Sequence, residues 1–442
     1  MFRPKFAAAI AAAALAATLA ACGGGAGGSD DDGPVTITFW HAMSGNNGET
    51  LAALVQEFND TNDSDITVEA VFQGKYNELL TKLKASIQSN GSPTLAQVFE
   101  IGTQIMVDTG ATVPFEELAA EQGVSMDGID PSIASYFTVD GQLQALPFNT
   151  SGPLVYLNVD ALTEAGLDPD TAPTTWSEVL ELADQLTERN GSETSRYGMV
   201  LSIDGWFVEQ MLAAGGVDYC DASNGREGRA DAVNWEGGEV ADIVSGWADG
   251  VQDGTILNVG RNNTDAAAAF QAGRAAMIMF TSANLRDMIS ESDFEVAVKP
   301  YVRPDGTDAG GAFNGGAALW TMASATDAER AAAAEFQEFL VSADAQSSWA
   351  TSTGYIPLNP AAVETDEFSE VLEEFPAFSV AGEQLQASTG TGCLMGTMPQ
   401  ARDAMNDIIE SAITGSAEVS TAIENAQSSM ETIIADYNAS VG

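Results

Sequence analysis

Apolar positions along this chain follow two alternating patterns, short continuous runs and longer stretches with helical spacing. The run VTITFW is typical of a buried strand, whereas Leu51, Leu54 and Phe58 recur at the spacing of one helix face. Residues 35–100 divide into strand 35–40, helix 49–59, strand 66–72, helix 76–88 and strand 94–100. This alternation predicts an open α/β sheet with right-handed crossovers.

Three polar side chains fall at the carboxyl ends of these strands or just beyond them, namely His41, Tyr76 and Glu100. In open α/β sheets, ligands gather outside the carboxyl ends of the strands. A binding edge is therefore expected there. His41 is the only histidine in 442 residues, and we favour a structural role for it over direct ligand contact.

A second α/β region follows the extended segment ALPFNTSGPLVYLN, which is typical of chain passing between two lobes. Its elements are helix 175–188, strand 197–203, strand 275–280, a helix beginning at MPQARDAM, and a last helix over 419–437. Further crossings are expected near 294–302 and 353–359. The predicted organisation is a first lobe of residues 35–148 plus 296–354 and a second lobe of residues 149–295 plus 355–442.

The first residues resemble a secretory signal with a bacterial lipobox. Arg3 and Lys5 precede an apolar run that is too short to span a membrane and ends in Leu-Ala-Ala-Cys22. The resemblance implies that residues 1–21 are a lipoprotein signal peptide and that Cys22 carries the lipid, on the extracytoplasmic side of the cell membrane. The alternative is an ordinary signal peptide cleaved nearby.

Residues 22–34 contain no large apolar side chain before Pro34 and are expected to be a flexible tether. The three aspartates at 30–32 within it are interpreted as a solvated charge run rather than a metal site.

The balance of charge narrows the class of partner. The chain carries a net charge of −48, which becomes −50 with 14 Lys and Arg once Arg3 and Lys5 are removed. Such acidity repels nucleic acid and anionic lipid headgroups, so the lipid anchor is the only membrane contact expected. Cys220 and Cys393 either form a disulfide, which an exported protein allows, or remain free thiols.

Several segments together resemble one family. FWHAMSGNNGETLAALVQEFN, QGKYNELL, QVFEIGT, PFNTSGPLVYLN, GRAAMIM, GGAALW, TGYIPLN and MGTMPQARDAM occur in the order and spacing of extracellular solute-binding proteins of ABC importers. More narrowly, they are similar to the glycerol-3-phosphate and glycerophosphodiester-binding group. The resemblance implies an α/β, two-lobed periplasmic-binding-protein-like fold of type II, with a ligand cleft between the lobes.

The family's ligand contacts, transferred by position, are Tyr76, Glu100, Ser151, Thr281, Gly316, Tyr355 and Arg402, with Trp206 retained from a pair of tryptophans. Arg402 is expected in the opening turn of a helix, where it and free N–H groups bind phosphate; the alternative is an arginine that is solvated or paired with an acid. Gly316 is expected to let the ligand approach the backbone. Ile203 replaces the second tryptophan and Thr281 replaces a serine, so the preferred headgroup stays open.

The resemblance implies that the ligand is a small phosphorylated polyol or sugar and that the protein partners are ABC permease subunits with a cytoplasmic ATPase. It also implies that the binding protein is a monomer without cofactor or metal. Three alternatives stay open. An uncharged oligosaccharide is the first. The second is a secreted carbohydrate-active enzyme, although the chain lacks the histidines for a serine triad or a zinc site. The third is a structural lipoprotein.

Overall fold

The computed structural model describes residues 33–191 and 193–441. The predicted signal peptide, Cys22 and all of the predicted tether except its last two residues lie outside this range. The chain from Pro34 onward forms one unit that contains two six-stranded sheets. No helix of the described residues is both long enough and apolar enough to cross a membrane.

The first sheet has the order β2-β1-β3-β14-β4, and β7 also pairs with β14. Its strands are β1 Val35–His41, β2 Ile66–Phe72, β3 Leu95–Phe99, β4 Thr112–Val113, β7 Leu146–Ser151 and β14 Gly315–Met322. Strands β1, β2 and β3 are parallel, whereas β14 runs antiparallel to its neighbours. All five residues of β3 are buried because helices cover both faces of the sheet.

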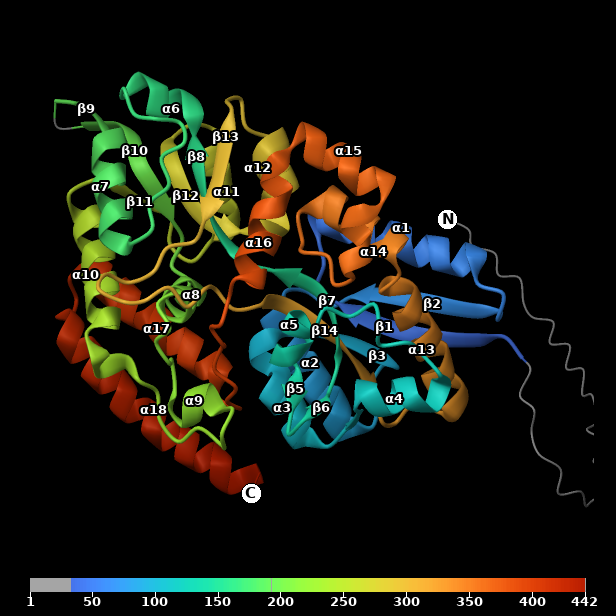
Figure 1. The fold of residues 1–442 in the computed structure, drawn as a ribbon. Helices are drawn as coiled ribbons and strands as arrows, with labels where there is room; N and C mark the ends of the chain where they lie inside the picture. The colour runs from blue at the N-terminus through green and yellow to red at the C-terminus, as the bar shows by residue number, and fades with distance from the viewer. Residues whose placement is uncertain (1–32, 192, 442) are drawn as a thin grey trace, which may run out of the picture. The chain divides into compact units, whose positions relative to one another are not determined.

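The second sheet has the order β11-β10-β12-β8-β13, with β9 paired to β10. Its strands are β8 Pro153–Asn158, β9 Glu188–Asn190, β10 Glu193–Leu201, β11 Ile256–Asn258, β12 Ala275–Thr281 and β13 Val296–Pro300. A separate hairpin joins β5 Thr138–Val139 to β6 Gln142–Leu143. Figure 1 shows the second sheet and its helices on the left and the first sheet on the right.

Helices of the first lobe are α1 Gly45–Thr61, α2 Tyr76–Ser89, α3 Thr103–Thr109, α4 Phe115–Gln122, α5 Pro131–Tyr136, α13 Asp327–Leu340 and α14 Ala343–Thr353. The predicted apolar stripe of α1 is buried as expected, since Leu51 and Phe58 are at most 2% exposed. Helix α13 begins with a capping box, in which Thr326 and Glu329 satisfy each other's backbone N–H groups.

Helices of the second lobe are α6 Val159–Glu164, α7 Trp176–Leu186, α8 Gly205–Ala214, α9 Asp221–Gly225, α10 Glu239–Gln252, α11 Asn263–Gln271, α12 Leu285–Ser290, α17 Met398–Thr414 and α18 Val419–Val441. Two more, α15 Asp366–Glu374 and α16 Val380–Gln386, lie in the segment that returns to this lobe. Helix α8 is buried along nearly its whole length, so it lies inside the molecule rather than on its surface.

Strand pairing moves the predicted lobe boundaries. Strand β7 belongs to the first sheet up to Ser151, so the first crossing comes at Gly152 and not at 149. Strand β13 pairs with β8 of the second sheet, so the assignment of residues 296–300 to the first lobe is wrong. The third crossing also comes later than 355, because α15 packs against α14 whereas α16 packs against β13.

Candidate functional site

A cavity of about 280 Å³ lies between the two lobes at the carboxyl ends of the strands. All eight residues transferred from the family line it, namely Tyr76, Glu100, Ser151, Trp206, Thr281, Gly316, Tyr355 and Arg402. Eight more residues line it that the sequence comparison did not select: Asn47, Phe99, Asp204, Phe207, Asn263, Phe280, Ala283 and Asn284. The cavity thus takes walls from both lobes and from the crossing strands.

Most of these side chains lie at or next to the first or last residue of a helix or strand. Tyr76 is the first residue of α2, and Glu100 opens a single 3₁₀ turn directly after β3. Ser151 and Thr281 are the last residues of β7 and β12. Because strands of an open sheet end along one edge, residues far apart in sequence meet there.

Arg402 does not offer a free guanidinium to the cavity. Its Nε and Nη2 atoms donate to both carboxylate oxygens of Glu209, at 2.8 and 2.6 Å, and Nη2 also donates to Glu100 at 2.8 Å. Only Nη1 has no hydrogen-bond partner among the described residues. Arg402 is also the fifth residue of α17, which begins at Met398. That Arg402 binds a phosphate together with free N–H groups of the opening turn stays a prediction, for which Nη1 is the remaining donor of the side chain.

Burial has the largest influence on the pKa values of the Glu100 and Arg402 side chains, which lie together with Glu209. The side chains of Glu100 and Glu209 are 4% and 2% exposed, and that of Arg402 is 13% exposed. Burial raises the pKa of the Glu100 carboxyl, while the charge of Arg402 opposes the rise. Burial alone would lower the pKa of Arg402, but the charges of Glu209 and Glu100 hold it well above its usual range. The arginine is therefore permanently charged.

Aromatic rings form much of the wall. Tyr76 stacks on Phe99 with ring centroids 5.2 Å apart, and Tyr355 stacks on Trp349 at 5.3 Å. Burial raises the pKa of both tyrosines, so their hydroxyls stay protonated. The Tyr76 hydroxyl accepts a hydrogen bond from Asn149 at 2.8 Å, so its proton is left for the neighbouring Tyr355 hydroxyl or for a ligand.

Several polar groups face the cavity with spare hydrogen-bonding capacity. The half-buried Asn47 donates to the carbonyl of Ala283 at 3.2 Å, and its Oδ1 has no partner among the described residues. The Ser151 hydroxyl and the Trp206 indole N–H also have no hydrogen-bond partner among the described residues. A ligand with both donors and acceptors would satisfy these groups.

The local structure also explains why residues 316 and 281 are Gly316 and Thr281, apart from any contact with a ligand. Gly316 adopts a φ of 102°, and a Cβ there would collide with the carbonyl oxygen of Asn149 on the neighbouring strand. Close packing of β14 on β7 therefore requires glycine, whether or not a ligand approaches. The Thr281 hydroxyl accepts from Ala283 N at 3.2 Å and caps the turn after β12.

His41 does not line this cavity. It is 8% exposed and packs between Phe39 and Phe72, and its Nδ1 has no hydrogen-bond partner in the part of the chain that the structure describes. Burial lowers the pKa of its imidazole to about 4. These surroundings agree with the structural role favoured from the sequence.

Cys220 and Cys393 form a disulfide whose Cα atoms lie 5.9 Å apart. Both are in the second lobe, where the bond ties the α9 segment to the chain that leads into α17. Of the two alternatives left open by the sequence, the structure contains the bridge.

The sequence is matched over residues 53–377 by the family model for bacterial extracellular solute-binding proteins. This chain belongs to that family. The solute-binding protein is 30% identical over 400 residues to the sn-glycerol-3-phosphate-binding periplasmic protein UgpB of Brucella melitensis, an alignment that covers 88% of this chain and 91% of the relative. The predicted family is confirmed.

Solved structures share its fold. UgpB from Mycobacterium tuberculosis, in complex with glycerophosphocholine, superposes with a TM-score of 0.80 at 22% identity and covers 92% of this chain and 99% of its own. The GacH receptor of Streptomyces glaucescens, solved in unliganded form and with acarbose, gives 0.77 at 17% identity over 91% of this chain and 99% of its own. The two-lobed fold predicted for this solute-binding protein is confirmed. The Brucella relative is named a binding protein and GacH a receptor.

Proposed function

We propose that this protein captures a glycerol-phosphate compound, preferably a glycerophosphodiester with a cationic headgroup such as glycerophosphocholine, for an ABC importer. One observation carries the proposal: the eight positions transferred from the glycerol-phosphate-binding group all line one cavity. The Brucella relative named for sn-glycerol 3-phosphate and the Mycobacterium structure holding glycerophosphocholine support the same ligand class.

The size of the cavity favours a compact solute. Its volume of about 280 Å³ lies just below the range of about 300–1,000 Å³ that is usual for small-molecule sites. A long oligosaccharide would need more room than this arrangement of the lobes leaves.

The charges favour a diester over a monoester. Arg402 is the only cation among the lining residues, and Glu100 and Asp204 line the same cavity. Free glycerol 3-phosphate carries close to two negative charges at neutral pH and would meet both carboxylates. A phosphodiester has one negative charge for Nη1 of Arg402, and a quaternary ammonium group suits the Asp204 carboxylate and the face of Trp206.

An uncharged sugar is the second candidate. The commitment of Arg402 to two carboxylates favours it, because hydroxyls rather than phosphate would then meet Glu100. The acarbose complex of GacH supplies an example on the same fold.

Titration calorimetry with three solutes separates the candidates. Glycerophosphocholine should bind most tightly, glycerol 3-phosphate more weakly, and maltose not measurably. Tight binding of maltose with no heat from either phosphate compound would replace the first candidate with the second. Chemical change of any bound solute, followed by phosphorus NMR, would instead reveal an enzyme.

The remaining parts of the proposed system follow from the leader and the family. Cys22 would carry the lipid that holds a monomer on the extracytoplasmic face of the cell membrane, and permease subunits with a cytoplasmic ATPase would receive the solute. The apolar run ending in Leu-Ala-Ala-Cys22 supports the anchor. Cys22→Ser should release the protein from the membrane fraction, whereas Cys220→Ser should not; retention of both variants would contradict lipidation at Cys22.

A further inference from the structure

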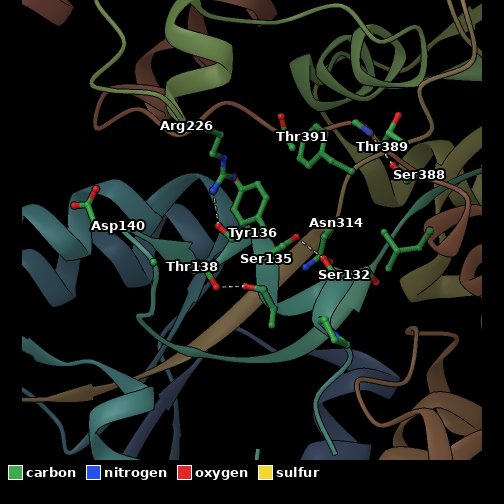
Figure 2. Close-up of a pocket in the computed structure, with 16 residues that line it drawn as sticks. Ser132, Ser135, Tyr136, Thr138, Asp140, Arg226, Asn314, Ser388, Thr389 and Thr391 are labelled. Carbon is green, nitrogen blue, oxygen red and sulfur yellow. Dashed lines mark hydrogen bonds between the residues drawn. The ribbon is translucent and has the colours of Figure 1, made fainter. Parts of the chain in front are cut away.

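A second cavity, of about 720 Å³, lies between the lobes and shares no lining residue with the first. Its walls are residues 131–141 of the first lobe, Arg226 and residues 385–391 of the second lobe, and Phe313 and Asn314 of a crossing segment. Figure 2 shows Ser132, Ser135 and Thr138 on one side and Ser388, Thr389 and Thr391 on the other.

The lining is rich in hydroxyl groups, of which some are free to accept a hydrogen bond and others are free to donate one. The Ser135 and Thr138 hydroxyls donate to main-chain carbonyls at 2.7 and 3.0 Å, so their lone pairs can accept from a ligand. The Ser388 hydroxyl accepts from Gly390 N at 3.2 Å, so its proton can be donated. Groups of both kinds suit a ligand whose own hydroxyls donate and accept.

Asn314 supplies an independent sign of a ligand. The residue is 3% exposed and its amide donates to the carbonyl of Ile133 at 3.4 Å, but its Oδ1 has no partner within residues 33–191 and 193–441. A buried acceptor without a hydrogen bond destabilises the folded state. Protein atoms cover Oδ1 itself, so the amide has to turn toward the cavity before a ligand hydroxyl can donate to it.

The charges exclude a phosphate as the ligand's main feature. Arg226 reaches across from the second lobe, donates to the carbonyls of Tyr136 at 3.0 Å and Gly392 at 3.3 Å, and lies 4.9 Å from the centre of the Tyr136 ring. Its terminal nitrogens are thus committed to the protein, and Figure 2 shows Arg226 beside Tyr136. The other charged lining residue is Asp140, which would repel an anion.

We propose that this cavity is a second binding site, for a neutral polyhydroxylated molecule of sugar size. The site is independent of the glycerol-phosphate ligand proposed above, because no lining residue is shared. Sucrose is a suitable probe, since it is neutral, carries many hydroxyls and is small enough for the volume.

Hydrogen exchange of the full chain with millimolar sucrose tests the site. Sucrose should slow exchange in peptides covering 131–141 and 385–391 and leave peptides covering 281–284, at the first cavity, unchanged. Absence of slowing, or slowing confined to the first cavity, would overturn the proposal.

Two obstructing variants approach the cavity from opposite walls, so that one misfolded protein does not end the test. Ser388→Trp and Ser135→Trp should each abolish the sucrose effect while the affinity for glycerophosphocholine stays within twofold of the unmodified protein. Thr281→Trp is the matched control, since it obstructs the first cavity and should leave the sucrose effect intact. A sucrose effect that survives in either correctly folded serine variant would contradict the site.

Discussion

Two arginines of the second lobe meet carboxylates of the first lobe, and their surroundings differ. Arg402 is 13% exposed and held between Glu100 and Glu209 within the first cavity. Arg229 is 40% exposed and pairs with Asp108, whose buried carboxylate also accepts from the Tyr437 hydroxyl at 2.8 Å. The first contact faces the cavity, whereas the second lies at the edge of the lobe interface, where it borders a different pocket.

The difference separates solute recognition from lobe contact. A buried ion pair that loses one member leaves an uncompensated charge and costs about 3–5 kcal/mol. An exposed arginine is screened by water, and its pair contributes about 0–1 kcal/mol. Arg402 with Glu100 and Glu209, the Arg402 trio, should therefore govern both stability and solute binding. Asp108 with Arg229 and Tyr437, the Asp108 cluster, should mainly govern how long the lobes stay together.

The largest expected effect comes from Arg402→Ala. It leaves Glu100 and Glu209 buried without a counter-charge, so the free energy of unfolding should fall by about 3–5 kcal/mol and glycerophosphocholine binding should disappear. Urea unfolding and calorimetry measure the two effects. Arg261→Ala is the matched control, because Arg261 pairs at the surface with Asp407 and Glu410 of α17, the helix that also carries Arg402. Near-normal affinity in Arg402→Ala would show that phosphate is not bound there.

The next largest effect is on the pH dependence of stability. It comes from His41, a buried side chain that takes part in neither arginine contact. The imidazole pKa of His41 falls from 6.5 to about 4 on folding, so the unfolded chain binds the proton more tightly. This contribution to stability is complete above pH 6.5 and is lost as the pH falls from 6.5 to 4, by up to about 3 kcal/mol. His41→Gln should unfold with a shallower pH dependence over that range. Parallel curves for the two proteins would contradict a neutral, buried imidazole.

A smaller effect is expected from Asp204→Asn, which removes one negative charge from the cavity. An asparagine oxygen can still accept from Trp206 N and cap α8, as Asp204 does at 3.1 Å. The ratio of affinities should shift about tenfold toward glycerol 3-phosphate and away from glycerophosphocholine, equivalent to about 1.4 kcal/mol. Asp265→Asn makes the same charge change outside the cavity and should not shift the ratio. An unchanged ratio in Asp204→Asn would remove Asp204 from headgroup selection.

The smallest effect is expected from Tyr437→Phe, which deletes one hydrogen bond to Asp108. A bond to a carboxylate contributes about 1.5 kcal/mol or somewhat more, and only its share in holding the lobes together affects the solute. The dissociation rate of glycerophosphocholine should rise severalfold with little change in the association rate, as stopped-flow fluorescence can measure. Tyr197→Phe serves as the control. Equal dissociation rates would show that the Asp108 cluster does not hold the lobes together.

Much of the first sheet was predictable because its signals are local. The run VTITFW and the stripe of Leu51, Leu54 and Phe58 mark β1 and α1 without reference to the rest of the chain. The lobe boundaries were less predictable, since β13 could pair with either sheet and only its contact with β8 assigns it to the second. Strand pairing between distant segments is not encoded in either segment alone.

The candidate site divides in the same way. Tyr76, Glu100 and Trp206 were selected through family segments, and they do line one cavity. Glu209 was missed, although a single acid in the apolar helix GWFVEQMLAA was a signal that it needed a buried partner. Asn47 and Asp204 had no comparable signal, because polar residues at helix starts are common.

The sequence by itself determined the alternation of strands and helices, the acidity, and the residue types available to a solute. Only the tertiary structure decided that Arg402 would lie between Glu100 and Glu209, that Cys220 would reach Cys393, and that Asn314 would be buried with a free oxygen. The physical reason is distance along the chain. Periodicity reports contacts within a few residues, whereas each of these contacts joins segments that meet only after both sheets have formed.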